Sequence, residues 1–237
     1  MNAGKGRDSA RGAGDRDLGV RLKTAHKRTL SSQRWLERQL NDPFVARAKR
    51  DGYRSRAAYK LLEIDEKHRL LKHGQRIVDL GAAPGGWSQI AARKVGSGKG
   101  AGAVAAIDLL EIEPIAGVDF IALDFMDEAA PDRLKAMIGG PADGVMSDMA
   151  ANTTGHKKTD HLRIIGLAEA ALDFARETLA PGGFFLVKLF QGGDTVHLVN
   201  DLKRDFATVR HIKPEASRAD SSELYVLATG FRGGATR

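Results

Sequence analysis

Cysteine is absent from this chain. Disulfide bonds and thiolate metal sites are therefore excluded, and the lack of disulfides suits a cytoplasmic protein. No apolar stretch approaches the roughly 18 residues that a membrane-spanning helix needs, so we expect no membrane helix. The N-terminus has no apolar core of the kind found in secretory signals, so we expect no signal peptide. No cluster of histidines and carboxylates indicates a metal, and we expect none.

Acidic residues are scarce in the first quarter of the chain. Residues 1–56 carry 15 Lys and Arg against 6 Asp and Glu, a net of +9, and the remaining 22 against 24 give −2. Such asymmetry is typical of a polyanion partner, most often nucleic acid, although a solubilising tail explains the first 25 residues equally well. Residues 1–30 contain too few apolar side chains for a core, and we predict that they are disordered.

The basic segment changes character after residue 30. Residues 31–40 predict a basic helix that ends before Pro43. From Phe44 to Arg56, basic residues alternate with aromatic ones, and Lys and Arg bind phosphates while aromatic rings stack on bases. We interpret residues 31–56 as an RNA-facing helical part of a single domain that spans 31–237. A solvated basic face is the alternative.

Glycine and proline are concentrated in one turn of the remaining chain. The apolar run Ile77–Leu80 predicts a buried parallel strand, and Trp87–Val95 has helical spacing. The turn between them contains Gly81, Gly85 and Gly86. Glycines at a strand end allow backbone N–H groups to approach a ligand, and the next helix offers its positive N-terminus. This pattern predicts the nucleotide-binding corner of a doubly wound α/β sheet.

The residues of this turn are more specific than its glycine content. The dinucleotide fingerprint is G-x-G-x-x-G, whereas this chain has D-x-G-x-x-P-G-G-W. Proline has no N–H and stiffens the turn, so the loop is poorly suited to wrapping a pyrophosphate. The string resembles the S-adenosylmethionine loop of RNA ribose methyltransferases. That resemblance implies S-adenosylmethionine as the cofactor, held by Asp79, Gly81, Pro84, Gly85, Gly86 and Trp87.

Acids follow several of the later predicted strands. Val104–Asp108 predicts the second strand, and its acid lies 22 residues after Gly86, where acids of nucleotide-binding folds bind ribose hydroxyls. Asp119–Leu123 predicts the third strand. The following Asp124 is placed either to reach an adenine or to cap a helix.

The rest of the chain completes the sheet. Strands are predicted at Gly144–Ala150, Phe184–Phe190, Val209–Ile212 and Glu223–Thr229, and helices at His161–Leu179 and Val196–Phe206. The first of these helices should stop at the Pro-Gly-Gly turn of residues 181–183. Seven strands with interleaved helices predict a three-layer α/β/α domain.

Two lysines lie in unusual places. Lys188 is near the end of the apolar strand Phe184–Phe190, and unpaired buried lysines are rare, so a functional role is favoured. Lys60 lies beside the apolar face of a helix for which Ser55 is the expected N-cap.

Four residues now stand together: Lys60, Asp148, Lys188 and Glu223. Their contexts are S-R-A-A-Y-K-L, S-D-M, V-K-L-F and S-S-E-L-Y. With the glycine loop they resemble the FtsJ-type RNA 2′-O-ribose methyltransferases, from about Ser31 to Phe231. The resemblance implies a seven-stranded mixed sheet in the Rossmann-like methyltransferase fold. It also implies that the four residues form a catalytic tetrad, and that Asp108, Asp124 and Asp148 bind the cofactor.

The resemblance implies a substrate as well, the 2′-hydroxyl of a uridine in the A-loop of 23S rRNA within the large ribosomal subunit. The nearly neutral body with one basic edge favours a monomer. Two alternatives remain open: a 2′-O-methyltransferase that acts on tRNA or an mRNA cap, and a non-catalytic ribosome-assembly protein on the same fold. We also expect RNA contact from His156-Lys157-Lys158 in a polar loop over residues 151–160.

The chemistry of methyl transfer is compatible with such a tetrad. A ribose hydroxyl is a very weak acid, so its attack benefits from removal of the proton in the transition state. An amine accepts that proton only when its ammonium form is destabilised, and Lys60 would destabilise that of Lys188 while the two acids would stabilise it. Two roles therefore stay open for Lys188: a general base, or a group that holds the hydroxyl in line with the methyl.

Overall fold

The computed structural model describes residues 33, 37, 40–151, 155–191, 195–218 and 221–233. The chain divides into two units, Met1–Ala46 and Arg47–Arg237. In the first unit Gln33, Glu37 and Leu40 are helical, and helix α2 (Pro43–Asp51) begins there, with the Asp42 carboxylate accepting the Phe44 N–H at 3.0 Å. Residues 1–30, for which disorder is predicted, lie outside the described residues, and the single-domain boundary at residue 31 stays a prediction.

The second unit is an α/β domain. Its helices are α3 (Ala57–His68), α4 (Gly86–Val95), the 3-10 helix η2 (Ser97–Lys99), α5 (Ala130–Ile138), α6 (Lys157–Thr178) and α7 (Val196–Asp205). Its strands are β1 (Arg76–Leu80), β2 (Ala103–Asp108), β3 (Asp119–Ala122), β4 (Ala142–Ser147), β5 (Leu179–Phe190), β6 (Phe206–Ile212) and β7 (Glu223–Phe231).

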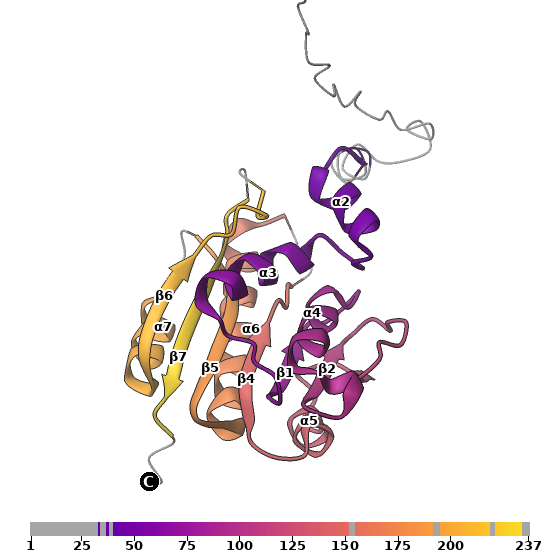
Figure 1. Cartoon of the computed structure of the whole chain (residues 1–237). Coiled ribbons are helices and arrows are strands. Elements are labelled where there is room, and N and C mark those ends of the chain that lie inside the picture. Colours follow the sequence, from indigo (N-terminus) through magenta and orange to yellow (C-terminus); the bar gives the residue numbers. More distant parts are fainter. Residues whose placement is uncertain are drawn as a thin grey trace, which may run out of the picture. The chain divides into compact units, whose positions relative to one another are not determined.

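The strands form one seven-stranded sheet in the order β3-β2-β1-β4-β5-β7-β6 (Figure 1). β1 to β5 are parallel, and β7 inserts antiparallel between β5 and β6. This confirms the predicted mixed sheet. The strand order reverses between β1 and β4, and ligands of open α/β sheets bind beyond the carboxyl ends of the strands at such a point.

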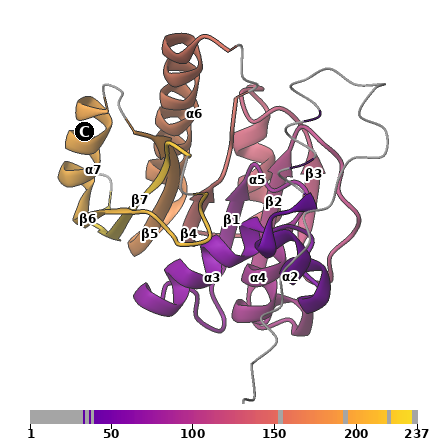
Figure 2. The same cartoon turned by 90° about the horizontal axis from the view of Figure 1, so that it is seen from above.

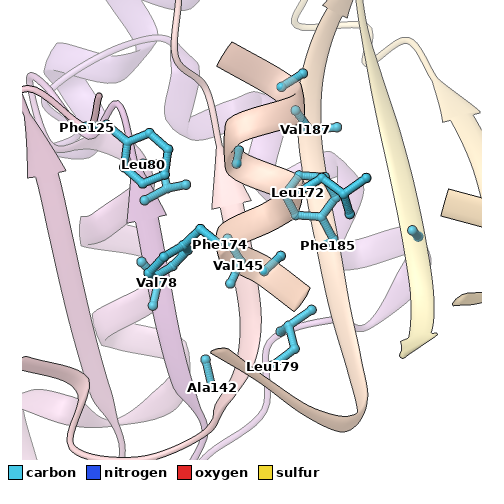
Figure 3. Close-up of a cluster of buried hydrophobic side chains, with 14 of the residues drawn as sticks. Val78, Leu80, Phe125, Ala142, Val145, Leu172, Phe174, Leu179, Phe185 and Val187 are labelled. Carbon is cyan, nitrogen blue, oxygen red and sulfur yellow. The ribbon is translucent and has the colours of Figure 1, made fainter. Parts of the chain in front are cut away.

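Helices cover both faces of the sheet (Figure 2). Residues of one core cluster come from α5, α6 and α7, and those of the other from α3 and α4. Alternate strand residues serve the two clusters, as the two-residue period of a strand requires. In β5, for example, Phe185 and Val187 belong to the α6 side (Figure 3), whereas Phe184 and Leu186 belong to the α3 side. By the same alternation Lys188 belongs to the α3 side.

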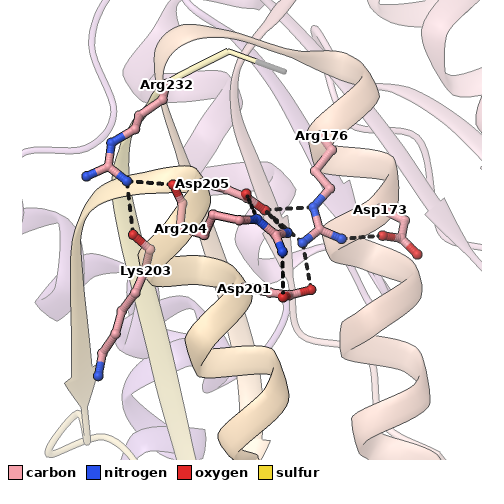
Figure 4. A network of polar contacts seen from close by, with 7 residues as sticks. All are labelled: Asp173, Arg176, Asp201, Lys203, Arg204, Asp205 and Arg232. Carbon is pink, nitrogen blue, oxygen red and sulfur yellow. Dashed lines mark hydrogen bonds and ion pairs between the residues drawn. The ribbon is translucent and has the colours of Figure 1, made fainter. Parts of the chain in front are cut away.

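Charged side chains fasten α6 to α7 at the surface (Figure 4). The Arg176 guanidinium contacts Asp173 at 2.6 Å, Asp201 at 2.8 Å and Asp205 at 2.7 Å. After β7, the Arg232 guanidinium donates to the backbone oxygen of Lys203 at 3.0 Å. These contacts join the ends of α6, α7 and β7, and none of them involves the glycine loop.

Several predicted boundaries are wrong. Helix α6 begins at Lys157, four residues before the expected start, so Lys157 and Lys158 belong to its first turn rather than to a loop. Strand β5 begins at Leu179, directly after the helix, and not at Phe184. The Pro-Gly-Gly turn lies inside that strand, where a register shift separates the Ala142–Leu179 pair from the Gly144–Phe184 pair.

The prediction that Ser55 is the N-cap of α3 is also wrong. The N-cap is Arg56, and no side chain forms a cap hydrogen bond there. The Ser55 hydroxyl lies instead against the glycine loop, and a Cβ on Gly86 would be 2.4 Å from it. A side chain at position 86 would force the Ser55 hydroxyl to move, so glycine suits this close approach between the start of α3 and the loop.

A stability prediction follows from the packing of β4 on β5. A Cβ on Gly144 would lie 2.2 Å from the Phe184 ring, so Gly144→Ala should destabilise the protein by about 1–3 kcal/mol through overpacking. Gly166 is an exposed residue in the middle of α6, and no atom lies within 4 Å of the position that a Cβ would take. Gly166→Ala should therefore stabilise the protein by up to about 1 kcal/mol. Urea unfolding of both variants measures the contrast, and equal midpoints would contradict it.

Candidate active site

The glycine loop turns sharply after β1 and packs against the segment that follows β4. Gly81 has a φ of 77°, and a Cβ there would lie 2.7 Å from the Met149 Cα. Gly85, with a φ of 105°, precedes the first residue of α4. Glycine is needed at both positions because the backbone is left-handed, and at Gly81 also because another backbone lies so close.

Asp108, at the end of β2, forms hydrogen bonds with the backbone of this loop and of the segment after β2. One of its carboxylate oxygens accepts the Ala83 N–H at 2.8 Å, and the other accepts the Leu110 N–H at 2.9 Å. Asp124, just after β3, is exposed and accepts the Met126 N–H at 2.9 Å. Each carboxylate oxygen has further lone pairs, so both acids can still accept bonds from a ligand.

A pocket of about 90 Å³ opens between these acids. It is lined by Gly81, Ile107, Asp108, Leu109, Leu123, Asp124, Phe125, Met149, Ala150 and Leu167. Apolar walls with two carboxylates suit the base and the hydroxyls of an adenosine, and the bare backbone of Gly81 leaves room beside them. The residues that line the pocket therefore fit S-adenosylmethionine. Three of them, Gly81, Asp108 and Asp124, were predicted to bind the cofactor.

The structure places the other predicted cofactor residues differently. Pro84 lines a neighbouring hollow with Arg54 and Glu111. The Trp87 side chain is 3% exposed, its Nε1–H donates to the Ala57 oxygen at 2.8 Å, and its ring lies 5.5 Å from that of Tyr225. It joins α4 to α3 and β7, so any cofactor contact at position 87 would come from the backbone.

Asp79 lies beneath the loop and is fully buried. Burial raises the pKa of this carboxyl to about 7, the Ser88 hydrogen bonds oppose that rise, and the nearby charges of Asp148 and Asp108 add to it. The Ser88 hydroxyl donates to one oxygen at 2.6 Å, and the other has no partner among the described residues. Asp79 therefore supports the loop from below and lies next to, not within, the pocket.

The four residues of the expected tetrad come together from four elements. Lys60 is on α3, Asp148 follows β4, Lys188 is on β5 and Glu223 begins β7. Lys188 pairs directly with Tyr225 across β5 and β7, and Phe190 pairs with Glu223. Residues two apart share a strand face, so Tyr225 and Glu223 both face α3, as Lys188 does.

The tetrad forms two ion pairs in a nearly dry setting. The Lys60 ammonium lies 2.6 Å from a Glu223 oxygen, and the Lys188 ammonium lies 3.0 Å from an Asp148 oxygen. The Lys188 ammonium also donates to the backbone oxygen of Asp148. The exposed fractions of the four side chains lie between 7% and 17%, so pairing is what makes their charges tolerable.

Tyr225 joins the two pairs, and the sequence prediction missed it. The Lys60 ammonium donates to its hydroxyl oxygen at 3.2 Å, and the hydroxyl donates to Asp148 at 2.8 Å. Burial and the nearby carboxylates raise the pKa of Tyr225 well above 10, so the hydroxyl keeps its proton and remains a donor. The one available signal was its position two residues after Glu223, on the same face of the strand.

Asp148 stays ionised in this cluster. Burial alone would raise its pKa, but the ammonium groups of Lys188 and Lys60, with the hydrogen bonds from Lys188 and Tyr225, hold the pKa below its ordinary value. Asp148 is also the neighbour of Met149, which lines the pocket. The Lys188–Asp148 pair therefore lies directly beside the place that suits the cofactor.

Comparison with known proteins identifies the family of this chain. A family model described as FtsJ-like methyltransferase matches residues 53–231. The chain belongs to the FtsJ-like methyltransferase family. It is accordingly a methyltransferase that uses S-adenosylmethionine, and the match contains the glycine loop and all four tetrad residues.

Relatives of this FtsJ-like methyltransferase resemble it over most of its length. The ribosomal RNA large subunit methyltransferase E of Xanthobacter autotrophicus is 69% identical over 227 residues, which is 96% of this chain and 89% of that protein. Its counterpart in Bradyrhizobium diazoefficiens is 70% identical over 92% of this chain and 96% of its own.

A solved structure supports the fold. The crystal structure of a ribosomal RNA methyltransferase from Plasmodium falciparum has a TM-score of 0.66 and 32% identity, over 77% of this chain and 100% of its own. Among the described residues, no three metal-ligating side chains gather in one place. No helix in the described parts of the chain is long and apolar enough to cross a membrane.

The raised pKa of Asp79 predicts how stability depends on pH. The folded-state pKa of about 7 exceeds the ordinary 3.8, so the resulting stability is complete below about pH 4 and is lost as the pH rises through 7. Asp79→Asn cannot ionise, so its stability relative to the wild type should improve by about 2 kcal/mol between pH 5 and 8. Urea unfolding at both pH values measures this change.

The matched control for Asp79→Asn is Asp119→Asn, at an exposed position at the start of β3. Its stability relative to the wild type should be the same at both pH values. Parallel behaviour of the wild type and Asp79→Asn from pH 5 to 8 would refute the buried-acid assignment.

Removal of the Tyr225 hydroxyl should separate catalysis from cofactor binding. Tyr225→Phe takes one donor from Asp148 and one acceptor from Lys60, so we expect kcat to fall about tenfold through misplacement of the cluster. Cofactor affinity should not change, because Tyr225 does not line the pocket. Single-turnover kinetics and calorimetry test both parts. The control is Tyr59→Phe. It loses the 2.7 Å hydrogen bond from the Tyr59 hydroxyl of α3 to the Asp51 carboxylate of α2, and its kcat should equal that of the wild type.

Proposed function

We propose that this enzyme methylates the 2′-hydroxyl of a uridine ribose in the A-loop of 23S rRNA, within the large ribosomal subunit. The observation that carries the proposal is the contiguity of the two sites, since Asp148 belongs to the tetrad and the next residue, Met149, lines the pocket. The names of the relatives, ribosomal RNA large subunit methyltransferase E, support the substrate. We further propose that it acts as a monomer, because one chain supplies every member of the tetrad. We place it in the cytoplasm, which the lack of cysteine suits.

In the proposed reaction, S-adenosylmethionine supplies an activated methyl group on a sulfonium. Lys188 has three N–H donors, and Asp148 accepts two of them, through its carboxylate and its backbone oxygen. The third is available to hold the ribose oxygen in line with the methyl group. With S-adenosylmethionine bound, the oxygen–carbon bond would form as the carbon–sulfur bond breaks, S-adenosylhomocysteine would be left, and the hydroxyl proton would pass to solvent water. This geometry favours the positioning role of Lys188 over that of a free general base.

The second ion pair keeps the cluster electrically balanced. Lys60 and Glu223 add one positive and one negative charge, and Tyr225 connects them to Asp148. A balanced, internally bonded cluster needs little rearrangement when charge shifts during the reaction. We propose that Lys60 and Glu223 fix Asp148 through Tyr225, and that Asp148 in turn fixes Lys188.

Basic side chains near the start of the second unit suit an RNA substrate. Arg47, Lys49 and Arg50 of α2 are exposed. The Arg93 guanidinium of α4 lies over the Tyr53 ring at 5.3 Å. Exposed guanidinium and ammonium groups neutralise phosphates, and this binding weakens with salt. The RNA-facing role of residues 31–56 remains part of the proposal.

Substitution of Lys188 tests the catalytic assignment. Lys188→Ala should abolish methyl transfer and leave the affinity for S-adenosylmethionine nearly unchanged, because Lys188 does not line the pocket. Lys135→Ala is the matched control, since this lysine pairs with Glu177 at 2.6 Å between α5 and α6 and should not affect activity. A large loss of cofactor affinity in a calorimetric titration of Lys188→Ala would overturn the assignment.

To test the substrate, methyl transfer from labelled S-adenosylmethionine is measured on three substrates: large ribosomal subunits that lack ribose methylation, naked rRNA, and tRNA. The proposal predicts 2′-O-methyluridine in the A-loop, formed on subunits and absent with Lys188→Ala. Label in tRNA would keep the tetrad and change the substrate. No label on any RNA, with cofactor bound, would favour a non-catalytic assembly protein.

A further inference from the structure

The connection between β6 and β7 lies against the tetrad. It comprises residues 213–222, of which 219 and 220 are outside the described residues. Although it belongs to no helix or strand, Ala216 is 0% exposed and Ser217 is 7% exposed. Connections of this length usually lie on the surface, because buried backbone groups need partners. The partners here come from α3 and from Glu223.

Helix α3 and the turn before it hold Ala216 from two sides. The Ala216 N–H donates to both carboxylate oxygens of Glu63, at 3.1 and 3.2 Å. The Arg56 guanidinium donates to the Ala216 backbone oxygen. Glu63 lies three residues after Lys60, so the two side chains are neighbours on one face of the helix. The helix that carries the tetrad lysine therefore also holds this connection.

The next residue contacts the tetrad directly. The Ser217 hydroxyl donates to Oε1 of Glu223 at 2.9 Å, and the same oxygen lies 2.6 Å from the Lys60 ammonium. The Glu223 N–H donates to the Ser221 hydroxyl at 3.1 Å. The carboxylate of Glu223 is thus held between α3 and the β6–β7 connection.

We propose that Glu63 and Ser217 are positioning residues for methyl transfer. Glu63 fixes the backbone at Ala216, and the Ser217 hydroxyl then aims the Glu223 carboxylate at Lys60. The inference rests on the proposed function, because it assigns these residues to the same reaction.

The physical reason is the freedom of a carboxylate at a strand end. Glu223 is the first residue of β7, and Lys60 reaches it with a long, flexible chain. Without a second donor the carboxylate can rotate, and Lys60 and Tyr225 follow it. Misplacement of catalytic groups by about 1 Å can lower rates by about 100-fold. The contact between Glu63 and Ala216, 153 residues apart, prevents this without touching the substrate.

The test uses Glu63→Ala, Glu63→Gln and Ser217→Ala in methyl transfer to large ribosomal subunits. We expect kcat to fall about tenfold or more in Glu63→Ala and Ser217→Ala, with the KM for S-adenosylmethionine unchanged. Glu63→Gln keeps an oxygen that can accept the Ala216 N–H, so its kcat should stay within about threefold of the wild type. Such rescue would not be expected if the Glu63 charge mattered only for general stability.

A double-mutant cycle separates positioning from a merely structural role. Ser217 is inferred to act through Glu223, so Ser217→Ala should change kcat little in a Glu223→Gln background. Equal effects in both backgrounds, or wild-type kcat in folded Glu63→Ala and Ser217→Ala, would overturn the proposal. If Glu63→Ala fails to fold in a thermal melt, Ser217→Ala decides the outcome, because it removes only one hydroxyl.

A spectroscopic readout keeps this inference distinct from the proposed function. If the wild type transfers no methyl group to any RNA, the function is wrong, and the positioning contact is then tested without catalysis. The NMR signal of the Lys60 ε-carbon in lysine-labelled protein should shift in Glu63→Ala and Ser217→Ala and stay in place in Glu63→Gln. An unchanged Lys60 signal in all three variants would refute the contact by itself.

Discussion

The pairing of buried charges is the constraint on which the rest of this structure depends. Two ammonium groups and two carboxylates lie on the α3 side of the sheet at exposures of 7% to 17%, where an unpaired charge would be strongly destabilising. They form one connected series: Glu223, Lys60, Tyr225, Asp148 and Lys188. Its five members come from four elements, since Glu223 and Tyr225 share β7, so the series forms only when α3, β4, β5 and β7 are all in place.

The sheet topology is what makes this series possible. Because β7 inserts antiparallel beside β5, its first residues lie at the carboxyl end of β5, next to Lys188. Glu223 and Tyr225 therefore reach the edge where β1 and β4 end, which is also where the strand order reverses. The pocket beside Gly81 and the tetrad share this edge, and the consecutive residues Asp148 and Met149 connect them.

The sequence predicted the fold because strand and helix patterns are local signals, whereas the four tetrad residues were assigned together from the resemblance of their motifs to a known family. A lysine in an apolar strand, such as Lys188, is conspicuous wherever the strand lies. Tyr225 was missed because a tyrosine in a strand is ordinary core composition. Glu63 and Ser217 were missed because their role depends on contacts between residues distant in the chain. Asp79 and Trp87 were predicted as cofactor contacts, but both side chains are buried, Asp79 beneath the loop and Trp87 against α3 and β7.

Asp79 and Asp148 show how one site can keep two neighbouring acids in different states. Burial raises the pKa of Asp79 to about 7, and the nearby charges of Asp148 and Asp108 add to that rise. Asp148 is also buried, but Lys188 and Lys60 hold its pKa below the ordinary value. Paired titratable groups whose environments push their pKa values apart mark different tasks. Because its pKa is about 7, Asp79 is only partly ionised at neutral pH, and its like-charge repulsion on Asp148 is correspondingly weaker.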